Sequence, residues 1–299
     1  MSSAAPDLNL QPEPRRRSVV CLSPKGLHRV SYLEWGDPRN RDALVCVHGL
    51  TRSGRDFDDL ARALCGRWRV VCPDIAGRGE SDRLADPMLY AIPQYVSDMV
   101  TLIARLDVEA VSWVGTSMGG LIGMALAAQA ATPVKKLVLN DAGPVIARAS
   151  LERIATYVGS APVFPSLEKA EEYVRAVSAP FGPHSDAQWR FLAETWVRRN
   201  DDGSYAARYD PRIGEAFRST IPKEGNLEFW PVYEAVRCPS LVIRGERSDL
   251  LSRETASEMG RRGPKARMVE VAGVGHAPTL MHASQIDVVR NFLLEGEDA

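Results

Sequence analysis

VSWVGTSMGG, residues 111–120, is the stretch that decides the fold of this chain. A short apolar run typical of a buried strand leads into the pattern G-x-S-x-G and then into small residues typical of a helix. This order predicts a sharp strand-to-helix turn that presents the Ser117 hydroxyl at the carboxyl edge of a sheet. Gly115 and Gly119 are expected where a Cβ would collide with neighbouring backbone. The alternative is that Ser117 only caps a helix and the glycines only permit packing.

Apolar runs and helix-patterned stretches alternate on both sides of this turn. We expect further strands at residues 28–35, 43–47, 68–72, 136–139, 241–244 and 267–271, and helices at residues 56–64, 94–106, 117–129 and 283–294. Strands that are apolar throughout and separated by helices predict an α/β fold with a mostly parallel, doubly wound sheet.

The pattern changes between residues 143 and 236, where aromatic and charged helical stretches are broken by prolines and no apolar strand is evident. We therefore predict a helical cap, residues 143–236, inserted into one core made of residues 18–142 and 237–299. Residues 1–17 are predicted to form a loose N-terminal arm.

The composition restricts the kind of partner. With 37 basic and 38 acidic residues the formal net charge is -1, so neither nucleic acid nor an anionic membrane is expected to bind. No apolar run reaches the roughly 18 to 20 residues of a membrane helix, and the start does not resemble a secretory signal. We expect a cytoplasmic protein with a small-molecule substrate; its oligomeric state is not predicted.

Nothing in the cysteine and histidine spacing indicates a metal site. The five cysteines are scattered, with no C-x-x-C pair and no zinc-like Cys/His spacing. We expect no metal and no organic cofactor.

A serine hydroxyl needs a base, usually a histidine held in one tautomer by a carboxylate. Among five histidines, His276 lies in the glycine-rich loop AGVGHAP between the last strand and the last helix. That late position suits the chain order serine, acid, histidine, so we predict His276 as the base. The alternative is an exposed loop histidine.

The acid should follow a late strand. Asp249, in the polar loop after residues 241–244, is our first choice, with Glu246 close by. Asp141, after the strand at residues 136–139, is the runner-up, because a carboxylate there could reach the same histidine.

Acyl transfer also needs N–H donors for the developing oxyanion. We predict the backbone N–H groups of Met118, directly after the nucleophile, and of Leu50, in the loop after VCVHGL. His48 is expected to brace this loop.

These segments together resemble the α/β-hydrolase family. His48-Gly49-Leu50, PDIAGRGESD, GTSMG, the Asp249 loop and GVGHAP occur in that family's order, over about residues 25–142 and 237–295. The resemblance implies the roles given above. A serine at the turn resembles esterases, lactonases, thioesterases and carbon-carbon bond hydrolases, whereas epoxide and haloalkane hydrolases carry aspartate there.

The insertion has no motif of its own, but its aromatic residues suggest an apolar pocket roof. The predicted pocket residues are Arg52, Trp189 and Trp196; the alternative is that the aromatic residues pack within the cap, which is their more common role. Arg52 and Arg78 are each expected to be solvated; the alternative is that either binds a substrate carboxylate.

The sequence thus predicts a serine hydrolase that cleaves a small carboxylic ester, lactone or thioester through an acyl-enzyme. The rival hypotheses are a carbon-carbon bond hydrolase acting on a dioxo acid and, on the same scaffold, a non-catalytic receptor or a cofactor-free oxygen enzyme.

Overall fold

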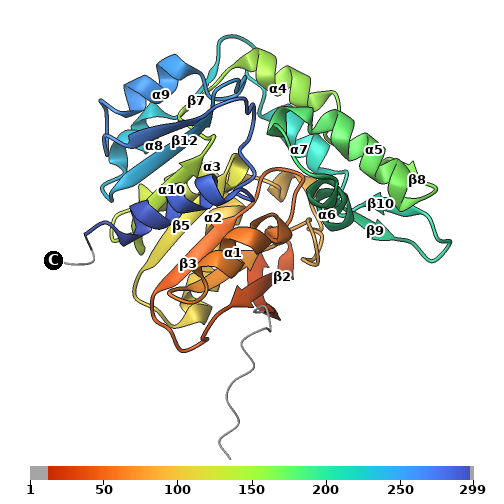
Figure 1. The fold of residues 1–299 in the computed structure, drawn as a ribbon, viewed down its shortest axis with the longest axis horizontal. Coiled ribbons are helices and arrows are strands. Elements are labelled where there is room, and N and C mark those ends of the chain that lie inside the picture. The colour runs from red at the N-terminus through yellow and green to blue at the C-terminus, as the bar shows by residue number, and fades with distance from the viewer. Residues whose placement is uncertain (1–12, 297–299) are drawn as a thin grey trace, which may run out of the picture.

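The computed structural model describes residues 13–296, and its centre is one eight-stranded sheet (Figure 1). The strands lie in the order β1-β2-β4-β3-β5-β6-β12-β13; β1 and β2 run antiparallel to their neighbours, and the other pairs are parallel. The strands are β1 (Arg15–Ser23), β2 (Gly26–Trp35), β3 (Ala43–Val47), β4 (Arg69–Pro73), β5 (Val111–Thr116), β6 (Val134–Asn140), β12 (Ser240–Gly245) and β13 (Arg267–Val271). The predicted mostly parallel α/β sheet is confirmed.

Helices cover both faces of this sheet. On one face, Leu60 of α1 and Val289 of α10 share a buried cluster with Leu44 of β3. On the other, Met99 of α2 and Ile122 of α3 share a second cluster with apolar residues of the same strand. The core helices are α1 (Asp58–Leu64), α2 (Ile92–Leu106), α3 (Met118–Ala127), α8 (Trp230–Ala235), α9 (Arg253–Met259) and α10 (Ala283–Leu294). Since alternate strand residues face opposite sides, the apolar strands serve two cores.

The N-terminal edge of the sheet is a hairpin of β1 and β2, of which the sequence predicted only residues 28–35 as a strand. Arg15–Arg17, expected in a loose arm, pair with β2 as the start of β1, so that part of the prediction is wrong; residues 1–12 lie outside the described residues. Three consecutive arginines hid the strand, but they lie at an edge where their side chains remain exposed.

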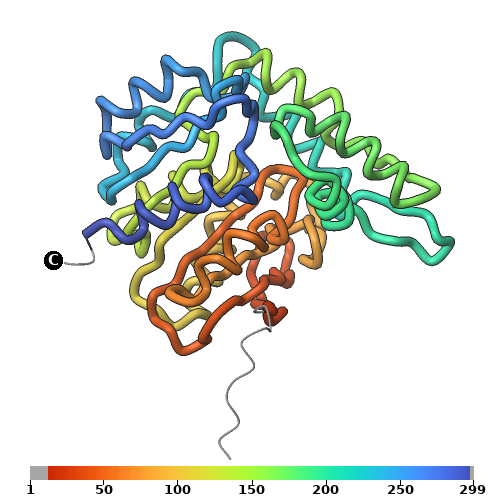
Figure 2. Tube along the Cα trace, in the orientation of Figure 1, coloured from red at the N-terminus to blue at the C-terminus, as the bar shows by residue number. Residues whose placement is uncertain are grey.

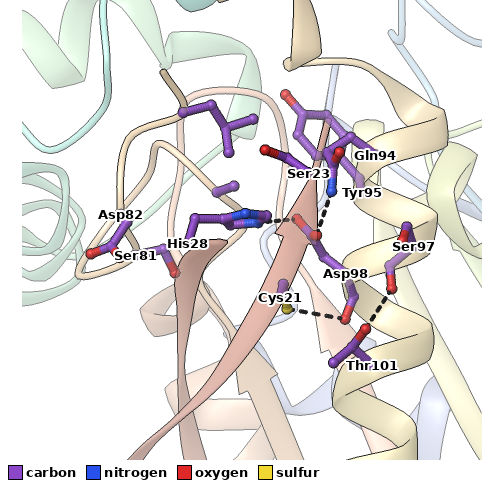
Figure 3. A network of polar contacts seen from close by, with 12 residues as sticks. Cys21, Ser23, His28, Ser81, Asp82, Gln94, Tyr95, Ser97, Asp98 and Thr101 are labelled. Carbon is purple, nitrogen blue, oxygen red and sulfur yellow. Dashed lines mark hydrogen bonds and ion pairs between the residues drawn. The ribbon is translucent and has the colours of Figure 1, made fainter. Parts of the chain in front are cut away.

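A buried polar network fixes this hairpin to α2 (Figure 3). His28 Nε2 bonds Asp98 Oδ2 at 3.0 Å, the Gln94 amide donates to Asp98 Oδ1 at 2.7 Å, and Cys21 Sγ lies 3.8 Å from the Asp98 carbonyl oxygen. Burial raises the pKa of Asp98, and the His28 hydrogen bond opposes that shift. The network thus links the edge strands β1 and β2 to the core helix α2.

The predicted cap corresponds to the segment between β6 and α8, much of which is drawn green at one side of the sheet in Figure 2. Residues 230–235, which the prediction placed in the cap, instead form α8 and contact α3 of the core. The helices of the cap are α4 (Arg148–Ala155), α5 (Leu167–Val177), α6 (Asp186–Trp196) and α7 (Ile213–Ser219). Although no apolar strand is evident in this part of the sequence, two small sheets occur here, formed by β7 (Val145–Ile146), β8 (Val163–Phe164), β9 (Val197–Arg199), β10 (Tyr205–Ala207) and β11 (Leu227–Glu228). Strands of two or three residues are too short to show an alternating pattern.

Among residues 13–296, no helix is long and apolar enough to span a bilayer.

Candidate active site

Ser117 lies at the sharp turn between β5 and α3. Its backbone has φ 52° and ψ -114°, a conformation that costs an L-residue about 1 to 3 kcal/mol and must be held by its surroundings. A Cβ at Gly119 would lie 2.0 Å from the Val47 carbonyl oxygen, and one at Gly115 would lie 2.2 Å from the Gly119 carbonyl oxygen. Both glycines are therefore required by close backbone approach, as the sequence predicted.

His276 reaches Ser117 from the loop between β13 and α10. Its Nε2 accepts from the Ser117 hydroxyl at 2.9 Å, and its Nδ1–H donates to Asp141 Oδ2 at 2.8 Å. The loop is held from two sides, because Gly275 N–H donates to the Pro180 carbonyl of the cap and the Asn140 amide donates to the Pro278 carbonyl. The two hydrogen bonds define one tautomer of the imidazole, with the proton on Nδ1.

The carboxylate on His276 belongs to Asp141 and not to Asp249, which corrects our first choice. Asp141 directly follows β6, its N–H donates to the Ile243 carbonyl of β12 at 2.7 Å, and its side chain is fully buried. The Asp249 side chain is 52% exposed and pairs with Arg153 of the cap at 2.6 Å. Both aspartates line the same cavity, since their strands are neighbours and end at the same edge.

The loop after β3 brings two predicted residues beside Ser117. A Cβ on Gly49 would lie 3.8 Å from the Ser117 Cβ. The Gly49 carbonyl accepts from His48 Nδ1–H at 2.7 Å and from Arg52 N–H at 3.3 Å, so this end of the Gly49–Leu50 peptide is fixed. Within the described chain the Leu50 N–H at the other end has no acceptor. Met118 begins α3, where backbone N–H groups also lack intrahelical acceptors.

His48 is a buried brace, as expected. Burial lowers its pKa to about 3, so the imidazole is neutral at ordinary pH. Its Nε2 accepts from the Ile75 N–H at 3.0 Å while its Nδ1–H holds the Gly49 carbonyl. The neutral ring therefore connects the loop after β3 to the loop after β4.

A cavity of about 540 Å³ opens over Ser117 and His276, lined mostly by apolar and aromatic side chains of core and cap. Of the three predicted pocket residues, Arg52 and Trp196 line it. Trp189 does not; it packs against His184 and under the Arg175 guanidinium. Sequence reasoning missed Arg153, on the polar cap helix α4, and Tyr157, two residues past its end, because no motif marks either position.

Neither arginine singled out in the sequence is solvated. Arg52 is largely buried and bound to Asp56 at 2.6 Å, and its Nη1 donates to the Leu192 carbonyl of α6 at 3.2 Å. Arg78 is only 1% exposed and lies outside the cavity lining. The expectation of surface arginines is wrong for both.

One group of potential metal ligands occurs among the described residues, although no spacing predicted it. The ligand atoms of Cys21, His28 and Asp98 all lie within 4.8 Å of one another (Figure 3). However, both Asp98 oxygens already accept hydrogen bonds, and His28 Nε2 is used by one of them. We assign this group to holding the hairpin.

The match to known proteins agrees with this geometry. The alpha/beta hydrolase fold family matches residues 42–283, and the chain belongs to that family. The chain is 52% identical over 285 residues to the 3-hydroxybutyrate-oligomer hydrolase of Cupriavidus necator, covering 93% of this chain and 97% of that protein. It is 27% identical to esterase YbfF of Escherichia coli over 84% of this chain and 91% of the relative. The crystal structure of an alpha/beta hydrolase from Novosphingobium aromaticivorans superimposes with a TM-score of 0.84 at 37% identity, covering 94% and 98% of the two chains.

Proposed function

We propose that this protein is a serine hydrolase that cleaves short oligoesters of 3-hydroxybutyrate. The hydrogen-bonded series Ser117, His276 and Asp141 at the base of a cavity is the observation that carries the proposal. The substrate class follows from the 3-hydroxybutyrate-oligomer hydrolase, which is similar along nearly its whole length. A mostly apolar cavity suits a chain of methyl-bearing units joined by uncharged esters.

In the proposed mechanism, Ser117 Oγ attacks the ester carbonyl carbon while His276 Nε2 takes its proton. The Leu50 and Met118 N–H groups receive the negative charge on the carbonyl oxygen. The carbon-oxygen bond to the leaving alcohol breaks, and His276 returns the proton to that alcohol. A water molecule then attacks the acyl-serine with His276 again as base, which releases the acid and regenerates Ser117. Asp141 orients the imidazole and stabilises its charged form throughout.

The rival reaction on a dioxo acid receives no comparable support. The preference for the ester rests on the similar 3-hydroxybutyrate-oligomer hydrolase and not on the arginines of the cavity, because 3-hydroxybutyrate oligomers end in a carboxylate as dioxo acids do. Arg52 is bound to Asp56 and to the cap. The other arginine of the lining, Arg153, is paired with Asp249.

Steady-state hydrolysis of the 3-hydroxybutyrate dimer and trimer by wild-type protein and Ser117→Ala tests the proposal. We expect the substitution to lower kcat/KM roughly 10⁴-fold or more, because the nucleophile is lost while the cavity is kept. Circular dichroism and a thermal melt control for folding, and p-nitrophenyl butyrate serves as a second ester, which lacks the 3-hydroxyl group and has an activated leaving group.

The two ester types separate the two parts of the proposal. Ser117-dependent cleavage of p-nitrophenyl butyrate without cleavage of the dimer and trimer would overturn the substrate class and keep the serine hydrolase. Folded wild-type protein that cleaves neither ester would overturn both. Cytoplasmic location stays a prediction, which fractionation of cells tests.

A further inference from the structure

Arg78 is a buried arginine in the loop after β4, where the chain reads Gly77-Arg78-Gly79. Both glycines have positive φ, 82° and 54°. A Cβ on Gly77 would lie 2.6 Å from the Tyr90 ring, and one on Gly79 would lie 2.3 Å from the Asp74 carboxyl group. The loop therefore turns tightly on each side of Arg78, whose side chain is buried in the core.

The guanidinium is surrounded by neutral groups. Its donors reach the carbonyl oxygens of Leu50 and Ala76, both at 2.8 Å, the Tyr95 hydroxyl at 2.7 Å and the Met118 sulfur at 3.5 Å. The rings of Tyr95 and Tyr90 lie 5.1 and 5.6 Å from its central carbon. Within residues 13–296 no carboxylate forms an ion pair with it. A buried cation without a counterion carries a large desolvation cost, so its retention requires a reason.

Two of its partners are the two residues proposed as oxyanion donors. Arg78 Nε–H holds the carbonyl of Leu50, and Nη2 contacts the side chain of Met118. The guanidinium thus bridges the loop after β3 and the first residue of α3, and it is not itself part of the cavity lining.

The main chain beside Arg78 is also fixed by the cap. Arg78 forms a β-bridge with Tyr209, Gly79 N–H donates to the Arg208 carbonyl at 2.8 Å, and Asp210 N–H donates to the Gly77 carbonyl at 2.7 Å. The guanidinium is therefore held between a fixed loop on one side and Leu50 and Met118 on the other.

We infer that Arg78 is a positioning residue for the oxyanion hole, and that its uncompensated positive charge stabilises the tetrahedral intermediate through the Leu50 and Met118 segments. This inference rests on the proposed function. The charge has no partner in the resting protein, but the reaction creates an anion beside the two residues that it holds. Because the surroundings are buried and already oriented, such a charge acts with little screening and little reorganisation.

A purely structural role predicts different behaviour. An arginine that only supports packing would, when replaced, lower the melting temperature and weaken ground-state and transition-state ligands alike. An arginine that serves the oxyanion would affect the charged tetrahedral state more than the planar, neutral one.

The experiment compares Arg78→Gln and Arg78→Lys with wild type on p-nitrophenyl butyrate, with two inhibitors. Butylboronic acid forms a tetrahedral anion on the serine, whereas butyramide stays planar and uncharged. For Arg78→Gln we expect kcat to fall between about 10- and 100-fold, and the boronate Ki to rise in parallel, while KM and the butyramide Ki stay within about threefold. Arg78→Lys keeps the positive charge but lacks the planar guanidinium, so its kcat and boronate Ki should lie between those of wild type and of Arg78→Gln.

Arg69→Gln is the matched control. Arg69 is another largely buried arginine of the β4 region, but it pairs with Glu34 and donates to the Leu106 carbonyl at the opposite end of the strand. Its replacement should lower the melting temperature and leave kcat and the boronate Ki within about twofold, since an ion pair distant from the site is lost.

Equal weakening of boronate and butyramide, or no change in either, would overturn the inference while Ser117-dependent turnover keeps the proposed function. Should Arg78→Gln fail to fold, Arg78→Lys alone decides by the same comparison of the two inhibitors. Absence of Ser117-dependent turnover in folded wild-type protein would overturn the proposed function and, with it, the role of Arg78.

Discussion

The loop after β6 and the loop after β12 each carry an aspartate to the same edge of the sheet, yet the two side chains have different surroundings. Asp141 is one residue past its strand, fully buried and bound to His276. Asp249 lies four residues past its strand, half exposed and paired with the cap residue Arg153. A position at the end of a strand therefore brings a carboxylate near the site, but the distance beyond the strand decides which group it meets.

Replacement of the buried carboxylate gives the largest expected effect of this comparison. Asp141→Asn keeps the shape of the side chain but removes the charge that orients His276, so we expect kcat on p-nitrophenyl butyrate to fall about 10⁴-fold. Steady-state kinetics with a thermal melt as folding control measure it. A folded variant within tenfold of wild type would contradict the assignment of Asp141.

His48 extends the comparison to a buried, neutral group at the same edge. Its folded pKa of about 3 lies below the ordinary value of about 6.5, so the unfolded chain binds the proton more readily. Its contribution to the free energy of unfolding is complete above about pH 6.5 and is lost as the pH falls toward 3.

Urea unfolding at several pH values between 7.5 and 4 measures this contribution. We expect His48→Gln to be less stable than wild type at pH 7.5 and to lose less stability on acidification, because one titrating group is removed. Parallel pH profiles for the two proteins would show that His48 does not titrate as its burial requires.

A double substitution tests whether Asp249 supports His276 when the charge of Asp141 is removed. Since Asp249 is held by Arg153, we expect Asp141→Asn/Asp249→Asn to be within about twofold of Asp141→Asn alone in kcat/KM. A further tenfold loss would reveal that Asp249 supports His276 when Asp141 is neutral.

The smallest effect belongs to Asp249→Asn by itself. Half-exposed ion pairs contribute about 0.2 to 1 kcal/mol, which corresponds to a melting temperature lower by less than about 4 °C. We expect kcat within about twofold of wild type. If Asp249→Asn lost most of its kcat while Asp141→Asn stayed active, Asp249 and not Asp141 would be the carboxylate that supports His276.

The sequence predicted the turn at Ser117, the alternation of strands and helices and the loop that carries His276, because each is encoded in a short local pattern. The choice between Asp141 and Asp249 was not encoded in this way, since both follow apolar strands, and the burial of one and the exposure of the other depend on contacts with segments distant in the sequence. The burial of Arg78 was missed for a related reason: a loop position suggests solvent, whereas here two glycines turn the chain so that the side chain enters the core. The arginine triplet at residues 15–17 concealed the start of β1, because such a charged run is not typical of a strand, although edge strands tolerate charge.

The hydrogen bond from Gly275 N–H to the Pro180 carbonyl joins the cap to the residue before His276. Any outward displacement of this part of the cap must stretch or break that bond, so the admission of a substrate and the alignment of the base share one mechanical element. A substitution in the cap that displaces Pro180 would therefore disturb the loop that holds the base as well as the cavity.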